Sequence, residues 1–183
     1  MKTHDPRQVV EDLRSNLAVH DRHLAFLFGA GTSSAVNIAS PAAPGEKPKH
    51  LPLIPGADQL TDACRVAVES IGKPQAEAWK ALIEQCEQEG TPANVENVLS
   101  KVRMKIEAVG ESEMLVGLSK AQLCEVEKSI RVTIAETVSP ASDKIPRVLP
   151  HHALASWVKR INRSLPLEVF TTNYDVLLER AFE

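Results

Sequence analysis

The sequence has few cysteines and no long apolar run, and these two absences exclude several classes of protein. Its three cysteines, Cys64, Cys86 and Cys124, are far apart and odd in number, which is typical of reduced, half-buried packing thiols rather than of a disulfide framework or a zinc site. No apolar stretch is long enough to cross a bilayer. The first residues, MKTHDPRQVVEDLRS, lack the apolar core of a signal peptide, so we expect a cytoplasmic protein without a membrane segment.

An excess of positive charge is also missing. The net charge of -3 gives no reason to expect direct nucleic-acid binding by this segment. Apolar residues make up 43% of the chain and charged residues 25%, a balance that is typical of a globular protein. The length of 183 residues suits one domain with room for a subdomain.

The spacing of apolar residues predicts many helices and two short strands. Val9, Leu13 and Leu17 recur every four residues, which is the spacing of one helix face. The continuous apolar run LAFLF is typical of a strand that is covered on both faces. We predict helices over residues 6–19, in a large block over residues 57–138, around 154–161 and after 175, strands at 24–28 and 167–170, and a loop with five prolines over residues 39–56.

Both predicted strands run directly into turns of small or polar residues, at 29–34 and at 171–175. In a parallel α/β sheet, ligands bind outside the carboxyl ends of the strands. We therefore expect an α/β fold in which a large helical insertion separates two strands, and in which the two turns build one cleft.

The first turn, Gly-Ala-Gly-Thr-Ser-Ser, has the composition of a phosphate-binding loop. Glycine accepts positive φ and lets a phosphate approach the backbone, while a helix that starts just afterwards offers free N–H groups to an anion. A dehydrogenase fingerprint would also need a third glycine or alanine where Ser34 stands, and an acidic residue about 20 positions later. That acid is missing, which disfavours an ordinary NAD dehydrogenase and leaves a ligand-free tight turn as the alternative.

The second turn, Thr-Thr-Asn-Tyr-Asp, places hydrogen-bonding side chains where the strand leaves the core. The amide of Asn173 can both donate to and accept from a ribose hydroxyl or a water molecule. Asp175 has a plainer alternative as the cap of the following helix. Tyr174 is expected to pack in the core.

Together the two turns resemble those of the SIR2 superfamily, in the form found in bacterial SIR2-like proteins of anti-phage defence. The Gly-Ala-Gly-x-Ser turn of that family is matched at residues 29–33, and its Thr-Thr-Asn-Tyr-Asp turn at 171–175. The resemblance implies a Rossmann-like sheet that binds NAD without a metal. It implies that Gly29, Ala30, Gly31, Thr32 and Ser33 hold the pyrophosphate and its neighbouring ribose, and that Thr172, Asn173 and Asp175 line the nicotinamide-ribose pocket, with Asn173 as the catalytic residue.

The family's base is a histidine in a His-Gly pair downstream of the asparagine, and none of the six histidines here precedes a glycine. We therefore expect residues 1–183 to be the N-terminal portion of a SIR2-like domain that hydrolyses NAD poorly by itself. His151 and His152 lie upstream, where they either line the cleft or have a structural or surface role. The segment 53–58 is the nearest match to a further family motif, but it lacks that motif's arginine.

The resemblance implies an NAD hydrolase that depletes cellular NAD in bacterial anti-phage defence. Its partners would be NAD as substrate and either further copies of the chain or a protein of the defence system. An NAD-dependent protein deacylase and a non-catalytic NAD or ADP-ribose binding module remain as alternatives.

Overall fold

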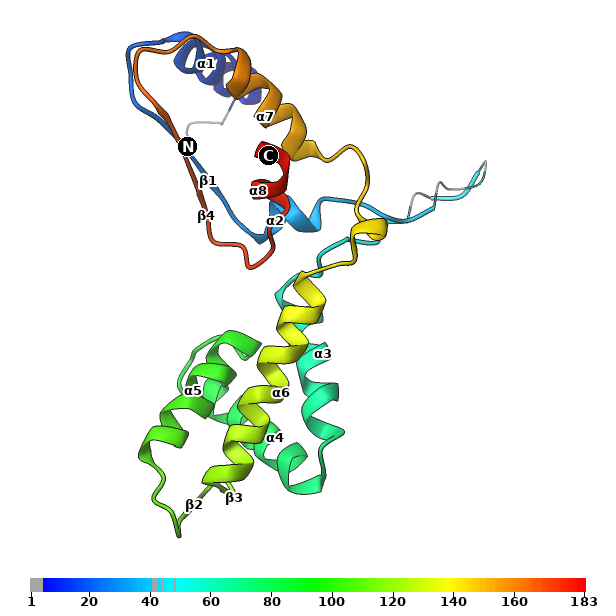
Figure 1. Ribbon diagram of the computed structural model, residues 1–183, viewed down its shortest axis with the longest axis vertical. Coiled ribbons are helices and arrows are strands. Elements are labelled where there is room, and N and C mark those ends of the chain that lie inside the picture. The colour runs from blue at the N-terminus through cyan, green and yellow to red at the C-terminus, as the bar shows by residue number, and fades with distance from the viewer. Residues whose placement is uncertain (1–4, 41–42, 44, 48) are drawn as a thin grey trace. The chain divides into compact units, whose positions relative to one another are not determined.

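The computed structural model describes residues 5–40, 43, 45–47 and 49–183, which form two compact units of mixed α/β structure (Figure 1). The sheet unit comprises residues 1–33 and 146–183, and the helical unit comprises Ser34–Ile145. Part of the predicted loop at 39–56, including Pro41, Pro44 and Pro48, lies outside the described residues.

The sheet unit is built on one pair of parallel strands. β1 (Leu24–Phe28) pairs with β4 (Leu167–Thr171) in a register that joins Leu24 to Leu167 and Phe28 to Thr171. Arg163 links the approaches to the two strands, since its guanidinium donates to the carbonyl oxygens of Leu17 at 3.2 Å and Arg22 at 2.8 Å. These contacts bring the starts of both strands to the same edge.

The sheet is covered on one face. Phe26 meets Trp157 edge to face, with 6.0 Å between the ring centroids, so α7 (Pro150–Arg160) packs against this side. On the opposite face, Leu27 is 74% exposed and Phe170 is 53% exposed. The prediction that the first strand is covered on both faces is therefore wrong, because its alternate side chains point away from α7.

Three further helices complete the sheet unit. They are α1 (Pro6–Ala18), α2 (Ala30–Ser34) and α8 (Leu177–Phe182). α1 begins after Asp5, whose carboxylate accepts from the Arg7 N–H at 2.9 Å. α2 occupies most of the segment that was predicted as a turn, so the glycine motif leads into a short helix at once.

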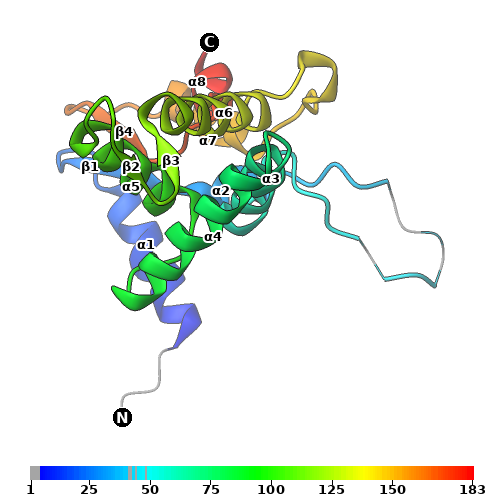
Figure 2. The same ribbon diagram turned by 90° about the horizontal axis from the view of Figure 1, so that it is seen from below.

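The helical unit contains α3 (Ala57–Glu69), α4 (Lys73–Gln88), α5 (Val95–Ala108) and α6 (Lys120–Val138). These four helices lie together in Figure 2, and they fill the predicted block 57–138. Their buried side chains form one apolar cluster: Leu60, Cys64, Val68, Trp79, Leu82, Cys86, Val98, Val102, Leu123 and Ile130. Burial raises the pKa of the Cys64 thiol to about 11, whereas Cys124 is exposed and is not the packing residue that the sequence predicted.

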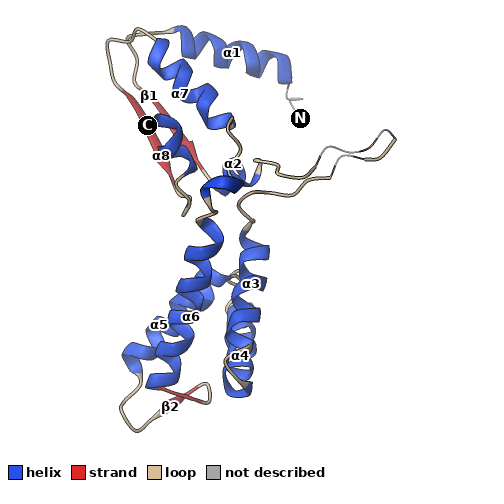
Figure 3. Cartoon of the chain, turned by 45° about the vertical axis from the view of Figure 1, so that its right-hand side comes forward, coloured by secondary structure: helices blue, strands red, loops and turns tan. Residues whose placement is uncertain are grey.

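A hairpin of β2 (Met114–Leu115) and β3 (Leu118–Ser119) joins α5 to α6 and was not predicted (Figure 3). Strands of two residues are too short to produce an apolar alternation. A 3-10 turn, Ser142–Lys144, follows α6. Within the described part of the chain, no helix has the length and apolar character that crossing a membrane requires.

We expect Leu123→Ala to destabilise the helical unit by about 2–5 kcal/mol, because Leu123 is fully buried and its truncation leaves a cavity. Val132→Ala, on the same helix, is the control, since Val132 is 45% exposed and should change stability by less than about 0.5 kcal/mol. Urea denaturation followed by Trp79 fluorescence in a Trp157→Phe background measures both. Equal midpoints would contradict the proposed core.

Candidate functional site

The parallel pairing brings the two predicted turns together at the carboxyl ends of β1 and β4. The Thr172 N–H donates to the carbonyl oxygen of Phe28 at 3.0 Å. A Cβ atom placed on Gly29 would lie 3.9 Å from the Thr172 Oγ1. The predicted adjacency of the glycine turn and the asparagine turn is confirmed, although the chain separates them widely.

The Asn173 side chain joins the turns directly. Its Nδ2 donates to the Ser33 Oγ at 2.8 Å and to the Thr32 Oγ1 at 3.2 Å. The Thr32 hydroxyl uses its own proton on the Gly29 carbonyl oxygen at 2.7 Å, so it can only accept from Asn173. Because the Thr32 hydroxyl can only accept, the Asn173 amide must face it with Nδ2 and not with Oδ1.

The other end of the amide has no such contact. The Asn173 Oδ1 is buried and has no hydrogen-bond partner among the residues that the structure describes. A buried acceptor that stays unsatisfied costs about 1–3 kcal/mol. The geometry therefore suits a donor such as a hydroxyl group or a water molecule at this position.

The glycine turn presents accessible backbone. Gly29, Ala30 and Gly31 are exposed, and no described atom lies within 4 Å of a Cβ placed on Gly31. Neither Gly29 nor Gly31 is among the described residues with positive φ, so the expected left-handed conformation is wrong for this motif. Thr32 closes the turn through its N–H and its hydroxyl, which both donate to the Gly29 carbonyl oxygen.

Asp175 and Tyr174 differ from their expected positions. The Asp175 carboxylate is buried and accepts from the Leu177 N–H at 3.1 Å, which makes it the cap at the start of α8. Tyr174 is 61% exposed and does not pack in the core. Thr172 is exposed beside Gly29.

The two neighbouring histidines have different surroundings. His152 accepts from the Leu149 N–H through Nδ1 at 3.0 Å, so it has a structural role at the start of α7. His151 is 5% exposed, and burial holds the pKa of its imidazole below the ordinary value, while the negative charges of Asp175 and Glu179 partly oppose this. His151 lies four positions before the buried Ala155, and this helical spacing was the signal for its buried face.

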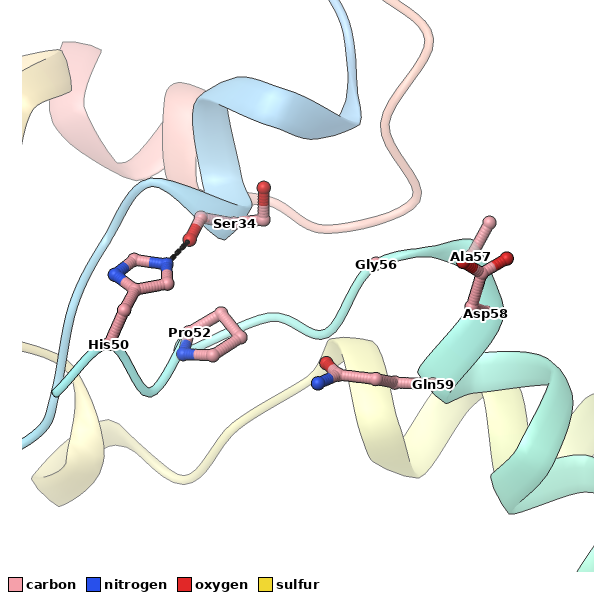
Figure 4. A pocket seen from close by; sticks show the side chains of 7 residues that line it. All are labelled: Ser34, His50, Pro52, Gly56, Ala57, Asp58 and Gln59. Atoms are coloured by element: carbon pink, nitrogen blue, oxygen red, sulfur yellow. Dashed lines mark hydrogen bonds between the residues drawn. The ribbon is translucent and has the colours of Figure 1, made fainter.

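A separate hollow of about 430 Å³ lies in the helical unit at the start of α3 (Figure 4). Its lining includes Asp58, Gln59 and His50, whose Nε2 is 3.0 Å from the Ser34 carbonyl oxygen. The lining contains the end of the segment 53–58. We assign no ligand to this hollow.

Neither a protein-family model nor a curated protein matches this sequence. An assignment of the site therefore rests on the two turn sequences and on the contacts between them.

We expect Thr32→Val to destabilise the sheet unit by about 1–3 kcal/mol, because it removes a donor to Gly29 and an acceptor for Asn173 at constant shape. Thr32→Ser keeps the hydroxyl and should retain most of the stability. Thermal unfolding followed by Trp157 fluorescence in a Trp79→Phe background compares the two variants. Equal losses in both would show that the methyl group, and not the hydroxyl, supports the turn.

Proposed function

We propose that the sheet unit belongs to a Rossmann-like NAD-binding domain whose reaction is the hydrolysis of NAD to nicotinamide and ADP-ribose. The motif resemblance supplies the ligand class. The observation that carries the proposal is the Asn173 Oδ1, a buried acceptor without a partner among the described residues, directed by a hydrogen-bonded amide at the strand ends.

The ribose next to nicotinamide has hydroxyl groups that match this acceptor. Because Oδ1 is buried in the free chain, the turn would open in the proposed complex so that a ribose hydroxyl or the attacking water donates to Oδ1 while Nδ2 stays bound to Ser33 and Thr32. An amide that is already held in place loses little further freedom when the ligand binds. Asn173 would thus orient the ribose and the attacking water with respect to each other.

Cleavage of the bond between nicotinamide and ribose passes through an oxocarbenium-like state, and nicotinamide departs as a neutral molecule. Asn173 would lower the barrier by positioning, which is a large effect when reacting atoms are held at attack distance. An amide cannot accept the proton of the water at neutral pH. The proposal therefore assigns orientation, and not proton transfer, to Asn173.

The exposed glycine turn would accommodate the pyrophosphate. Free space beside Gly31 allows a phosphate to approach the backbone, and the exposed Thr172 adds a hydroxyl at the same edge. Ser33 would contribute less to the ligand, since its side chain is 1% exposed and holds Asn173.

A non-catalytic module that binds NAD or ADP-ribose is the second candidate. One observation favours it: Asp175 and His151, a carboxylate and an imidazole that could act as bases, are both buried, at 6% and 5% exposure. A group that accepts the proton of the attacking water must reach that water. Nicotinamide release during incubation with NAD distinguishes the hydrolase from the module.

The wider role also stays a prediction from the resemblance. We expect a cytoplasmic protein that acts in bacterial anti-phage defence by depleting NAD, either as a homo-oligomer or with a partner protein of the defence system.

We expect Gly31→Val to abolish NAD binding, because a branched side chain would fill the open space that the pyrophosphate needs. Asn173→Ala should weaken binding by roughly 5- to 150-fold, the equivalent of one lost buried hydrogen bond of about 1–3 kcal/mol. Calorimetric titration of the chain with NAD measures both affinities.

Ala35→Val is the matched control, since Ala35 is exposed just after α2 and outside the predicted site. It should bind NAD with unchanged affinity, and circular dichroism should show the same helix content in all three variants. NAD affinity that is unaffected by both Gly31→Val and Asn173→Ala would refute the proposed site.

A further inference from the structure

Thr32 is the residue of the glycine turn whose hydroxyl group both donates and accepts within the site. Its proton goes to the Gly29 carbonyl oxygen at 2.7 Å, and its Oγ1 accepts from the Asn173 Nδ2 at 3.2 Å. The Thr32 N–H also donates to the Gly29 carbonyl oxygen, at 2.9 Å, so the backbone and the side chain hold Thr32 at the same point. A hydroxyl group that already uses its only proton can act toward Asn173 only as an acceptor.

The neighbouring Ser33 binds the same amide but does not decide its orientation. The Ser33 Oγ accepts from the Asn173 Nδ2 at 2.8 Å, and Ser33 is 1% exposed. A serine hydroxyl can accept from an amide nitrogen, as it does here, or donate to an amide oxygen, so it suits a reversed amide equally well. A reversed amide would place Oδ1 against the Thr32 Oγ1, where two acceptors would face each other. Of the two hydroxyl groups, only that of Thr32 therefore distinguishes the two orientations.

We propose that Thr32 determines the specificity of the site: its hydroxyl holds Asn173 with Oδ1 toward the ligand, so the site selects a ligand hydroxyl group, which can donate, over an analogue that lacks it. The buried Oδ1, which has no partner among the described residues, is the atom that such a hydroxyl would satisfy. That this hydroxyl belongs to the ribose next to nicotinamide rests on the proposed function. The orientation of the amide does not.

The selection follows from the cost of a buried acceptor without a partner. A ligand hydroxyl would donate to Oδ1 and remove this cost, whereas a deoxyribose in the same place would leave Oδ1 unsatisfied. Sites that are built to bind a hydroxyl group reject analogues without it more strongly than apolar pockets discriminate by size. Thr32 is a positioning residue in this proposal, because it acts on the ligand only through Asn173.

The first test measures the orientation of the amide by nuclear magnetic resonance and needs no ligand. We expect nuclear Overhauser effects between the Asn173 Nδ2 protons and the Ser33 β protons, because Nδ2 lies 2.8 Å from the Ser33 Oγ. Thr32→Val should weaken these signals, since both orientations become possible when the hydroxyl is removed at constant shape. Thr32→Ser keeps the hydroxyl and should keep the signals. Signals that are absent in the natural chain, or equally strong in Thr32→Val, would overturn the proposal.

The second test measures affinity by calorimetry for NAD and for two NAD analogues, whose nicotinamide ribose lacks either the 2′-hydroxyl or the 3′-hydroxyl group. The natural chain should bind NAD more tightly than at least one analogue by roughly 5- to 150-fold, the loss expected when a buried acceptor stays unsatisfied. Thr32→Val should reduce this preference to below about fivefold, because a reversed amide no longer presents Oδ1. Thr32→Ser should restore the preference.

Two serine variants are the matched controls. Ser33→Ala removes the shorter hydrogen bond to Asn173 and should weaken the binding of all three compounds, but it leaves Thr32 in place and should keep the preference. Ser164→Ala removes a hydrogen bond to the His20 carbonyl oxygen, ahead of both strands, and should change neither affinity nor preference. If circular dichroism shows that Thr32→Val is unfolded, Thr32→Ala removes the same hydroxyl without placing a branched side chain in α2.

The outcomes separate this inference from the proposed function. Amide signals that depend on Thr32, without any binding of NAD to the natural chain, support the orienting role of Thr32 and refute the NAD site. Equal affinity of the natural chain for NAD and for both analogues overturns the selection of a ribose hydroxyl and leaves the NAD site standing. A preference that Thr32→Val retains, or that Ser33→Ala loses to the same extent, overturns the role of Thr32.

Discussion

The parallel pairing of β1 with β4 is the interaction on which the candidate site depends. It joins chain segments that lie 140 residues apart, measured between Asn173 and Ser33. The cost of closing so long a connection grows only slowly with its length. Much of the connection is the helical unit, whose own apolar core orders it independently of the strands. Backbone hydrogen bonds between the strands, Arg163 before them and Asn173 after them then hold the two turns together.

The largest apolar core lies in the helical unit, whereas the candidate site lies in the sheet unit. The largest buried cluster comes from α3, α4, α5 and α6, whereas every residue of α1 is at least partly exposed and one face of the sheet shows Leu27 and Phe170. Regions with fewer buried apolar contacts open locally at lower free energy. The site therefore depends more on its hydrogen bonds than on a large core, which makes the contacts of Thr32 and Asn173 important for both stability and binding.

Three buried polar atoms without partners among the described residues, the Asn173 Oδ1, the His151 Nδ1 and the Arg163 Nε, lie in this sheet unit. Each unsatisfied atom lowers the free energy of unfolding, and a turn with a purely structural role would not need this loss. Functional sites commonly retain such costs, because groups that are left unsatisfied in the free protein are ready to bind a ligand or to change their charge. Of the three, the Asn173 Oδ1 belongs to the residue that joins the two turns, and it is the physical basis for the proposed function.

Much of the architecture followed from local patterns in the sequence. The four-residue spacing of Val9, Leu13 and Leu17 predicted α1, and similar spacing predicted α3 to α6, because a helix is stabilised by contacts within a few residues. The strands β1 and β4 and the two turns of small or polar residues that follow them were also predicted. Side-chain roles were less predictable, because local patterns do not say which neighbours surround a residue. Asp175 had two possible roles, His151 and His152 could not be distinguished, and the exposed Cys124 and Tyr174 were expected to be buried.

The sequence by itself determined the types and order of most elements and the adjacency of the two turns, since a parallel sheet brings its strand ends to one edge. Only the tertiary structure decided that Thr32 closes its own turn, that Asp175 caps α8 and that His151 is buried. The physical reason is that hydrogen-bond partners and burial depend on residues distant in the chain, whereas helix periodicity and turn composition depend on neighbours.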